Sequence, residues 1–145
     1  MSIDYSFHVS TTLGPETLMR TFLLSLGLPW DPKNPCSMDA PRFTAGVGPL
    51  PRDSREWMQE QRGLAPDQYF VFRTWSQYSV EAKEEIVRGT LAICQAVPGD
   101  AVLLFNGETV LFMRKSGTLY VNSAYWRGDY SFFTPPYELK AFDVL

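Results

Sequence analysis

Residues 97–122, VPGDAVLLFNGETVLFMRKSGTLYVN, decide the fold of this chain. Asn106-Gly107 predicts a tight hairpin, because a type I′ turn needs positive φ at both central residues and this pair tolerates that conformation. Ser116-Gly117 predicts a second tight turn. The segments around these turns are β-branched and aliphatic, which is typical of strands. The stretch therefore predicts a three-stranded β-meander over residues 100–122.

A long helix is predicted directly before the meander, over residues 80–96. Ser79 stands where a residue caps a helix N-terminus, and Pro98-Gly99 ends the helix. Acidic residues occupy its first turns, where the helix dipole favours negative charge. Its apolar stripe, at helical spacing, consists of Ile86, Val87, Thr90, Leu91, Cys94 and Val97.

The N-terminal half predicts two strands and two helices. Residues 3–10 alternate between apolar and polar side chains, as a half-buried strand does, with Ile3, Tyr5, Phe7 and Val9 on the buried side. A helix opens at Pro15, buries Leu18, Met19, Phe22, Leu23 and Leu26, and stops at Gly27.

Residues 54–62 predict a short helix anchored by Trp57 and Met58, with Asp53 in capping-box position. Residues 68–75 are apolar on both sides, which predicts a central strand.

Two stretches are irregular. Residues 28–52 form a proline-rich loop with one expected short strand at 42–47, and the prolines either stiffen a connection or frame a functional surface. Residues 123–145 form an aromatic tail that either completes the core or makes an interface. Alternation at residues 139–144 is consistent with a last short strand.

Composition narrows the class of protein. A length of 145 residues with 45% hydrophobic residues indicates a single globular domain, residues 1–145. The net charge of −3 argues against nucleic-acid binding, and two cysteines with one histidine supply too few ligands for zinc. No secretory leader or long apolar span is present, so we expect a cytoplasmic protein without a membrane partner, cofactor or metal.

These elements together predict the α+β class. We expect an antiparallel β-sheet of about five to seven strands, with two main helices packed on one face and a C-terminal β-meander. The sequence does not predict the order of the strands.

The second half of the chain resembles a bacterial family. The helix, the Pro98-Gly99-Asp100 turn, the Asn106-Gly107-Glu108 tip, Arg114 and Val121-Asn122 are similar to the immunity proteins paired with myxobacterial swarming-inhibition toxins, in their third immunity type. The N-terminal strand and leucine-rich helix are similar as well, but the tail around Trp126 is longer than in that family. The resemblance implies a small protein that binds and neutralises a cognate toxin in interbacterial competition, without catalytic residues.

A toxin-binding surface would combine aromatic side chains with an acidic rim. Aromatic side chains bury a large area at little entropic cost, and acidic charge steers a basic partner. The candidate partner-binding residues are Glu81, Glu84, Glu85, Glu108, Tyr125, Trp126, Asp129 and Tyr130. Each of these also has an ordinary explanation as a solvated charge or a core aromatic.

Two other functions remain open. A small enzyme or ligand-binding domain would need a pocket with convergent polar groups, and His8, Arg73 and Arg114 are its best candidates. His8 lies on the polar side of its strand, which is typical of a surface histidine. An assembly module would pair through an exposed sheet edge. For the immunity protein we expect a monomer or a weak homodimer.

Overall fold

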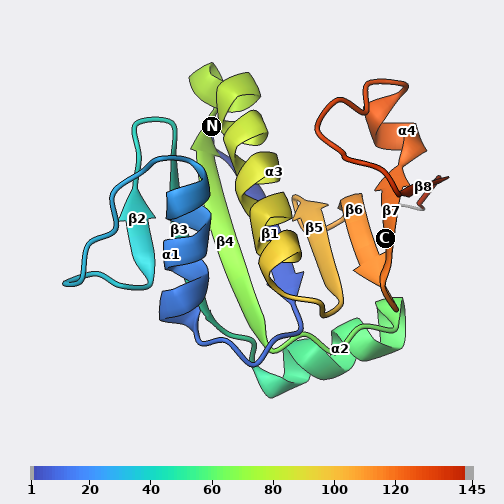
Figure 1. Cartoon of the computed structure of the whole chain (residues 1–145), viewed down its shortest axis with the longest axis horizontal. Coiled ribbons are helices and arrows are strands. Elements are labelled where there is room, and N and C mark those ends of the chain that lie inside the picture. The colour runs from blue at the N-terminus through green and yellow to red at the C-terminus, as the bar shows by residue number, and fades with distance from the viewer. Residues whose placement is uncertain (1, 143–145) are drawn as a thin grey trace.

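The computed structural model describes residues 2–142, and of Ser2 and Ile3 only the backbone. Its centre is one eight-stranded sheet in the order β2-β3-β4-β1-β5-β6-β7-β8 (Figure 1). All neighbouring strands are antiparallel except β7 and β8, which are parallel. The strands are β1 Ser2–Val9, β2 Ser37–Asp39, β3 Phe43–Pro49, β4 Gln68–Trp75, β5 Ala101–Phe105, β6 Thr109–Lys115, β7 Thr118–Asn122 and β8 Glu138–Lys140.

Four α-helices accompany the sheet, namely α1 Pro15–Ser25, α2 Arg52–Arg62, α3 Ser79–Ala96 and α4 Ser123–Trp126. Helices α1 and α3 pack side by side on one face, as Figure 1 shows. The predicted α+β class, with two main helices on one face, is therefore confirmed. The sheet has one strand more than expected because the proline-rich loop contains β2 as well as β3.

Strand β1 lies in the middle of the sheet, between β4 and β5. Phe7 lies opposite Phe70 on one side and Leu103 on the other. The first strand therefore joins the N-terminal and C-terminal halves of the chain. The predicted inward side chain of Ile3 and the end of the last predicted strand, residues 143–144, lie outside the described residues.

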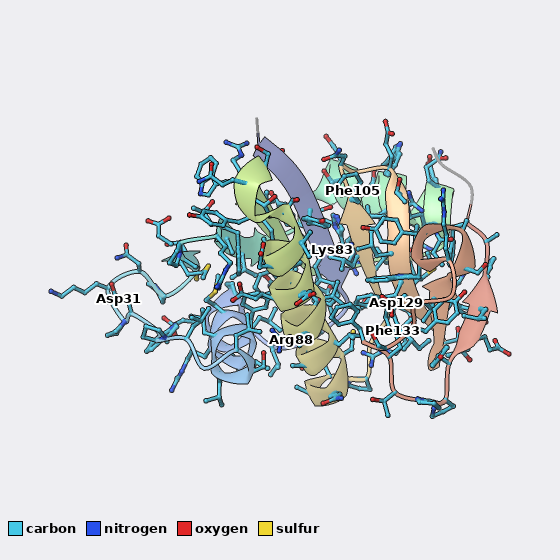
Figure 2. All side chains as sticks on the ribbon, turned by 90° about the horizontal axis from the view of Figure 1, so that it is seen from above. Asp31, Lys83, Arg88, Phe105, Asp129 and Phe133 are labelled. Carbon is cyan, nitrogen blue, oxygen red and sulfur yellow. The ribbon has the colours of Figure 1, made fainter. Side chains whose placement is uncertain are left out.

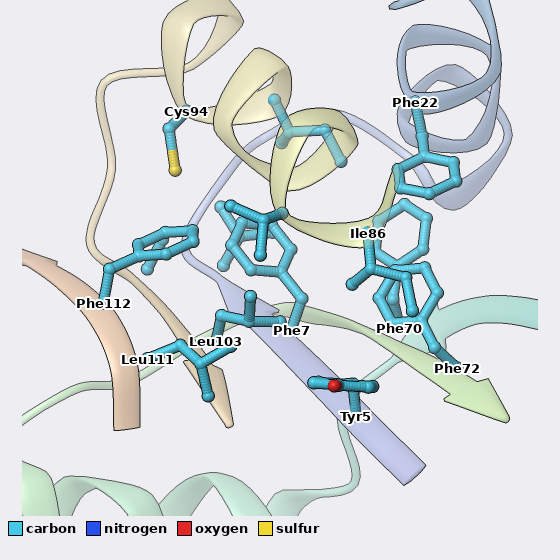
Figure 3. Packing of buried hydrophobic residues seen from close by; sticks show 14 of the residues in the cluster. Tyr5, Phe7, Phe22, Phe70, Phe72, Ile86, Cys94, Leu103, Leu111 and Phe112 are labelled. Atoms are coloured by element: carbon cyan, nitrogen blue, oxygen red, sulfur yellow. The ribbon is translucent and has the colours of Figure 1, made fainter. Parts of the chain in front are cut away.

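The main core lies between the sheet and the α1–α3 layer and is rich in phenylalanine (Figure 3). The rings of Phe70 and Phe72 stack with centroids 5.5 Å apart, and Phe22 of α1 packs on both. Gly89 of α3 is buried directly against this ring, since a Cβ at position 89 would lie 2.2 Å from Cε1 of Phe22. Close packing of α1 on α3 thus requires glycine at position 89.

The opposite face carries a smaller core under α2. Met58 is 3% exposed and packs with Leu64 and side chains from β5 and β6. Two expectations about α2 are wrong. Trp57 is 46% exposed instead of buried, and the helix starts at Arg52, one residue before Asp53, without a side-chain cap.

Strand β6 contains a bulge, and the side chains around it pack in both cores. Leu104 pairs with Val110 and Leu103 pairs with Phe112, so Leu111 is an extra residue. Leu111 and Phe112 consequently both enter the main core, whereas Val110 enters the smaller one. A bulge disrupts the regular ladder of backbone hydrogen bonds, so backbone groups there need other partners.

Side chains that follow β7 supply those partners. The amide Nδ2 of Asn122 donates to the carbonyl of Val110 at 2.7 Å, and the indole Nε1 of Trp126 donates to the carbonyl of Leu111 at 3.0 Å. Asn122 is 2% exposed, and its Oδ1 accepts from the backbone N–H of Ala124 at the start of α4. The first part of the aromatic tail is thereby fastened to the sheet.

The turn between α3 and β5 is held by Arg114 of β6. Its guanidinium donates to the backbone carbonyls of Cys94, Val97 and Gly99, with 2.9 Å from Nε to Gly99. The last carbonyls of a helix have no partner within the helix, so a cation there supplies both hydrogen bonds and favourable charge. A Cβ on Gly99 would lie 1.8 Å from the carbonyl oxygen of Ser10, which only glycine allows.

Two further features differ from expectation, and a third agrees with it. Strand β4 is interior and apolar on both sides as predicted, but it is buried on one face only, because Val71 and Trp75 are 43% and 42% exposed. Ser79 is the first residue of α3 and does not cap it. The turns are as predicted, with positive φ at Asn106-Gly107 and Ser116-Gly117.

Replacement of Gly89 by alanine should lower the free energy of unfolding by about 1–3 kcal/mol, because the new methyl group collides with Phe22 in a filled core. Alanine's greater helix propensity of about 1 kcal/mol only partly offsets this. Urea denaturation measures the change. The double variant Gly89→Ala/Phe22→Leu should be less destabilised than the sum of the single variants, and strict additivity would contradict the steric explanation.

Replacement of Arg114 by methionine should lower the free energy of unfolding by about 2–4 kcal/mol, since three carbonyl groups lose their donor. Lysine at position 114 should be intermediate. Arg73→Met is the matched control, because the Arg73 side chain is 57% exposed and its ion pair with Asp4 is a surface one. Equal stability of the Arg114→Met and Arg73→Met variants would disprove the structural role of Arg114.

Candidate partner-binding surface

Large apolar side chains gather on the surface where β4 passes into α3. Trp75 is 42% exposed, Tyr78 38% and Val80 61%. We call these three residues the junction patch. Among the described side chains only seven large hydrophobic ones are this exposed, so three of them within six consecutive positions is a marked concentration.

The local structure explains why these side chains face solvent. Trp75 follows Val71 and Arg73 on the face of β4 that points away from α1 and α3. Helix α2 packs on that face against side chains of β5 and β6, whereas Val71 and Trp75 of β4 remain exposed. The 3-10 helix Ser76–Tyr78 then turns the chain into α3 and brings Tyr78 outward. A shallow hollow of about 410 Å³ lies between these residues and Pro41.

Acidic side chains border the junction patch. Glu81 and Glu84 are exposed on the first turns of α3, and neither makes an ion pair within residues 2–142. Glu85 differs, because its carboxylate accepts from the Arg42 guanidinium at 3.0 Å and its side chain is only 14% exposed. Glu81 and Glu84 are therefore free to contact a partner beside the junction patch. Glu85 instead holds the segment before β3 against α3 through its ion pair with Arg42.

The predicted tail residues have mixed positions. Trp126 is 7% exposed and belongs to the main core, where Phe133 and Phe132 pack against it. Tyr125 and Tyr130 are half-buried. Asp129 is exposed, and its carboxylate accepts from the hydroxyl of Ser131 at 2.9 Å. The aromatic tail is therefore largely a part of the core, with Asp129 at its surface.

Lys83 connects α3 with this tail. Its ammonium lies 5.6 Å from the ring centroid of Tyr125 and 5.7 Å from that of Trp126, and Figure 2 shows it on the side of α3 that faces the tail. Cation–π contacts of this kind are weak but directional. They place the positive charge of Lys83 beside the aromatic tail. Glu108 is separate from both, at the exposed tip of the β5–β6 hairpin, where Arg62 donates to its backbone carbonyl at 3.4 Å.

His8 is buried, which corrects the expectation of a surface histidine. It is 9% exposed in the central strand, stacks on Tyr69 with centroids 5.7 Å apart, and has Nε2 3.2 Å from the hydroxyl of Ser6. Burial, with a smaller contribution from the positive charge of Arg62, lowers the pKa of His8 to about 4. The alternation of the strand was correct, but α2 covers its polar side at this point.

The polar groups considered for catalysis do not converge. His8 lies under α2, Arg73 pairs with Asp4 at 3.3 Å, and Arg114 is engaged with the end of α3. Burial raises the pKa of the Cys94 thiol to about 11, so it is a poor nucleophile.

Within residues 2–142 no group of three His, Cys, Asp or Glu residues is placed to hold a metal ion. No helix in the described part is long and apolar enough to cross a membrane.

The sequence analysis missed the junction patch. Residues 68–75 are apolar on both sides, which predicted a central strand and did not indicate which of its side chains are exposed. Arg73, two residues before Trp75, was the available signal, since alternating positions of a strand share a face and an arginine marks the face in solvent.

Fold and surface together describe a small α+β protein with a patch of exposed apolar side chains where β4 passes into α3. The SitI3-like family matches residues 3–129 of the chain. The chain belongs to this family, whose name indicates Sit immunity proteins, so the resemblance seen in the second half is confirmed at the level of the family. No curated protein and no solved structure matches the chain.

The buried histidine makes stability depend on pH. The pKa of His8 is about 4 in the folded protein and about 6.5 when unfolded, so between these values the unfolded chain binds more protons. Stability should therefore fall as the pH drops from about 6.5 to 4, by up to about 3 kcal/mol from this residue. His8→Gln should flatten the curve of urea midpoint against pH between 5 and 7. An unchanged curve would show that His8 does not titrate in this way.

Proposed function

We propose that this protein is an immunity protein that neutralises one cognate toxin by forming a stoichiometric complex with it. The observation that carries the proposal is the match of the SitI3-like family to residues 3–129. A protein of this kind acts by covering a surface of the toxin or by holding it in an inactive conformation. It needs affinity and specificity, and it needs no reacting groups of its own.

The junction patch supplies features that such a complex uses. Binding energy concentrates in a few aromatic side chains, with tryptophan and tyrosine enriched among them, and Trp75 and Tyr78 are exposed side chains of these types. Exposed Glu81 and Glu84 at the border favour a basic partner and speed its approach. We propose the junction patch and these two glutamates as the principal contact, with Asp129 and Glu108 as outlying candidates.

Expression in cells tests the function. The toxin is expected to be encoded next to this gene, and its expression alone should arrest growth. Co-expression of the immunity protein should restore growth, and the two purified proteins should elute together from size exclusion at a fixed ratio. Growth arrest that persists, together with separate elution, would contradict the proposal.

Substitution on the junction patch tests the location of the contact. Trp75→Ala should weaken binding of the toxin about 30-fold, the effect of a hot-spot residue worth about 2 kcal/mol. Glu81→Lys/Glu84→Lys should mainly slow association and reverse its dependence on salt. Trp57→Ala is the matched control, because Trp57 is a similarly exposed tryptophan, 46%, on α2. Equal affinity of the Trp75→Ala and Trp57→Ala variants would place the contact elsewhere, and Asp129→Lys and Glu108→Lys then test the outlying candidates.

A further inference from the structure

The proline-rich loop encloses a groove that the proposed function has not used. Residues 28–34 swing outward from the end of α1 and run along the outer side of β2 before the chain enters that strand (Figure 1). The space between this loop and the β2–β3 hairpin has a volume of about 640 Å³. We call it the loop groove. Asp31 lies at the outer end of the loop (Figure 2).

Apolar side chains form most of the wall. Leu23 of α1 is 1% exposed and Ala45 of β3 is 6% exposed, so both belong to the core below the groove. Leu28, Trp30 and Met38 add partly buried surface around them. The indole Nε1 of Trp30 donates to the carbonyl of Pro35 at 3.1 Å, which fixes the ring within the loop. A preformed apolar hollow of this kind suits a binding site.

The charge of the groove has one sign. Asp31 and Asp39 are among its lining residues, whereas no lysine or arginine is. Asp31 is held in place because its two carboxylate oxygens accept from the backbone N–H of Lys33 at 2.9 Å and from Nδ2 of Asn34 at 3.1 Å. The carboxylate of Asp39 makes no hydrogen bond or ion pair with another residue of the described part. A cation is therefore the complementary occupant.

The chain itself shows that a guanidinium suits this loop. The guanidinium carbon of Arg20 lies 4.6 Å from the ring centroid of Trp30. An arginine or lysine side chain also has an apolar stem, which matches the Leu28 and Met38 wall, while its charged end reaches carboxylates at the mouth. A long cationic side chain fits the groove better than a purely apolar one, which would leave the carboxylate of Asp39 without a partner and the charge of Asp31 without a counter-charge.

The loop groove is continuous with the proposed contact surface. Pro41 lines the groove and also lines the hollow beside Trp75 and Tyr78. One partner can therefore cover the junction patch and reach into the groove. A second copy of this chain is a weaker candidate occupant, because each copy carries a net charge of −3 and two like charges repel.

We propose that the loop groove receives a lysine or arginine side chain of the toxin, bound between the Trp30–Met38 wall and the carboxylates of Asp31 and Asp39. This proposal rests on the proposed function and extends it, because it names the chemistry of the toxin segment that is recognised. The proline-rich loop is then a specificity element, since only a toxin with a basic side chain at the matching place gains this contact.

The test uses the full chain and the purified toxin encoded by the adjacent gene, with affinity measured by calorimetry. Asp39→Lys should weaken binding at least about 10-fold, and Asp39→Asn should weaken it less and reduce its dependence on salt. Asp53→Lys is the matched control, an exposed acid of α2 remote from the groove, and should change the affinity less than about two-fold. The melting temperatures of the Asp39 variants should agree with that of the native protein, because Asp39 makes no contact that supports the fold.

The outcomes separate the two proposals. If the native protein does not bind the toxin, the proposed function fails and the groove proposal fails with it. If the native protein binds and Asp39→Lys binds equally well, the groove proposal alone is overturned. A change of oligomeric state in Asp39→Lys, seen by light scattering without loss of toxin binding, would instead make a second copy the occupant. Restored affinity between Asp39→Lys and a toxin whose basic residue is changed to glutamate would identify the partner side chain directly.

Discussion

The contact of Arg114 with the end of α3 is the interaction on which the rest of the structure depends. The Arg114 guanidinium donates hydrogen bonds to the carbonyls of Cys94, Val97 and Gly99. It thereby joins α3 to β6, the meander strand in which Arg114 lies. The same turn holds the first strand, because Ser10 donates to the carbonyl of Asp100 and passes close to Gly99. Since β1 lies between the two halves of the sheet, this one junction sets how the halves meet.

The residues that carry the family resemblance are structural in this chain. Arg114 and Gly99 shape the turn after α3, Asp100 accepts from the backbone N–H of Ser116 at 2.9 Å, and Asn122 satisfies the bulge of β6. These residues preserve a scaffold whatever partner is bound. The surfaces proposed for the toxin lie instead at the β4–α3 junction and along the proline-rich loop, where side chains are exposed and few contacts constrain them. A scaffold of this kind allows specificity to change without loss of the fold.

The candidate site was predictable in part. Glu81 and Glu84 were identified because acidic residues in the first turns of a helix point outward unless something covers them, and nothing does. Glu85 looked equivalent in the sequence, yet Arg42 lies beside it, 43 positions away in the chain. Trp126 could not be distinguished from an interface residue, because its role depends on the carbonyl that the β6 bulge leaves at Leu111.

The sequence by itself determined the meander, its two turns, the helices α1 and α3 and the α+β class, because turn chemistry and hydrophobic periodicity act over a few neighbouring residues. Only the tertiary structure decided that β1 is central, that α2 covers one half of the far face, and that Trp75 is exposed while His8 is buried. Each of these depends on which distant segment lies over a given side chain. Local patterns tell which face a residue occupies, but not whether another element covers that face.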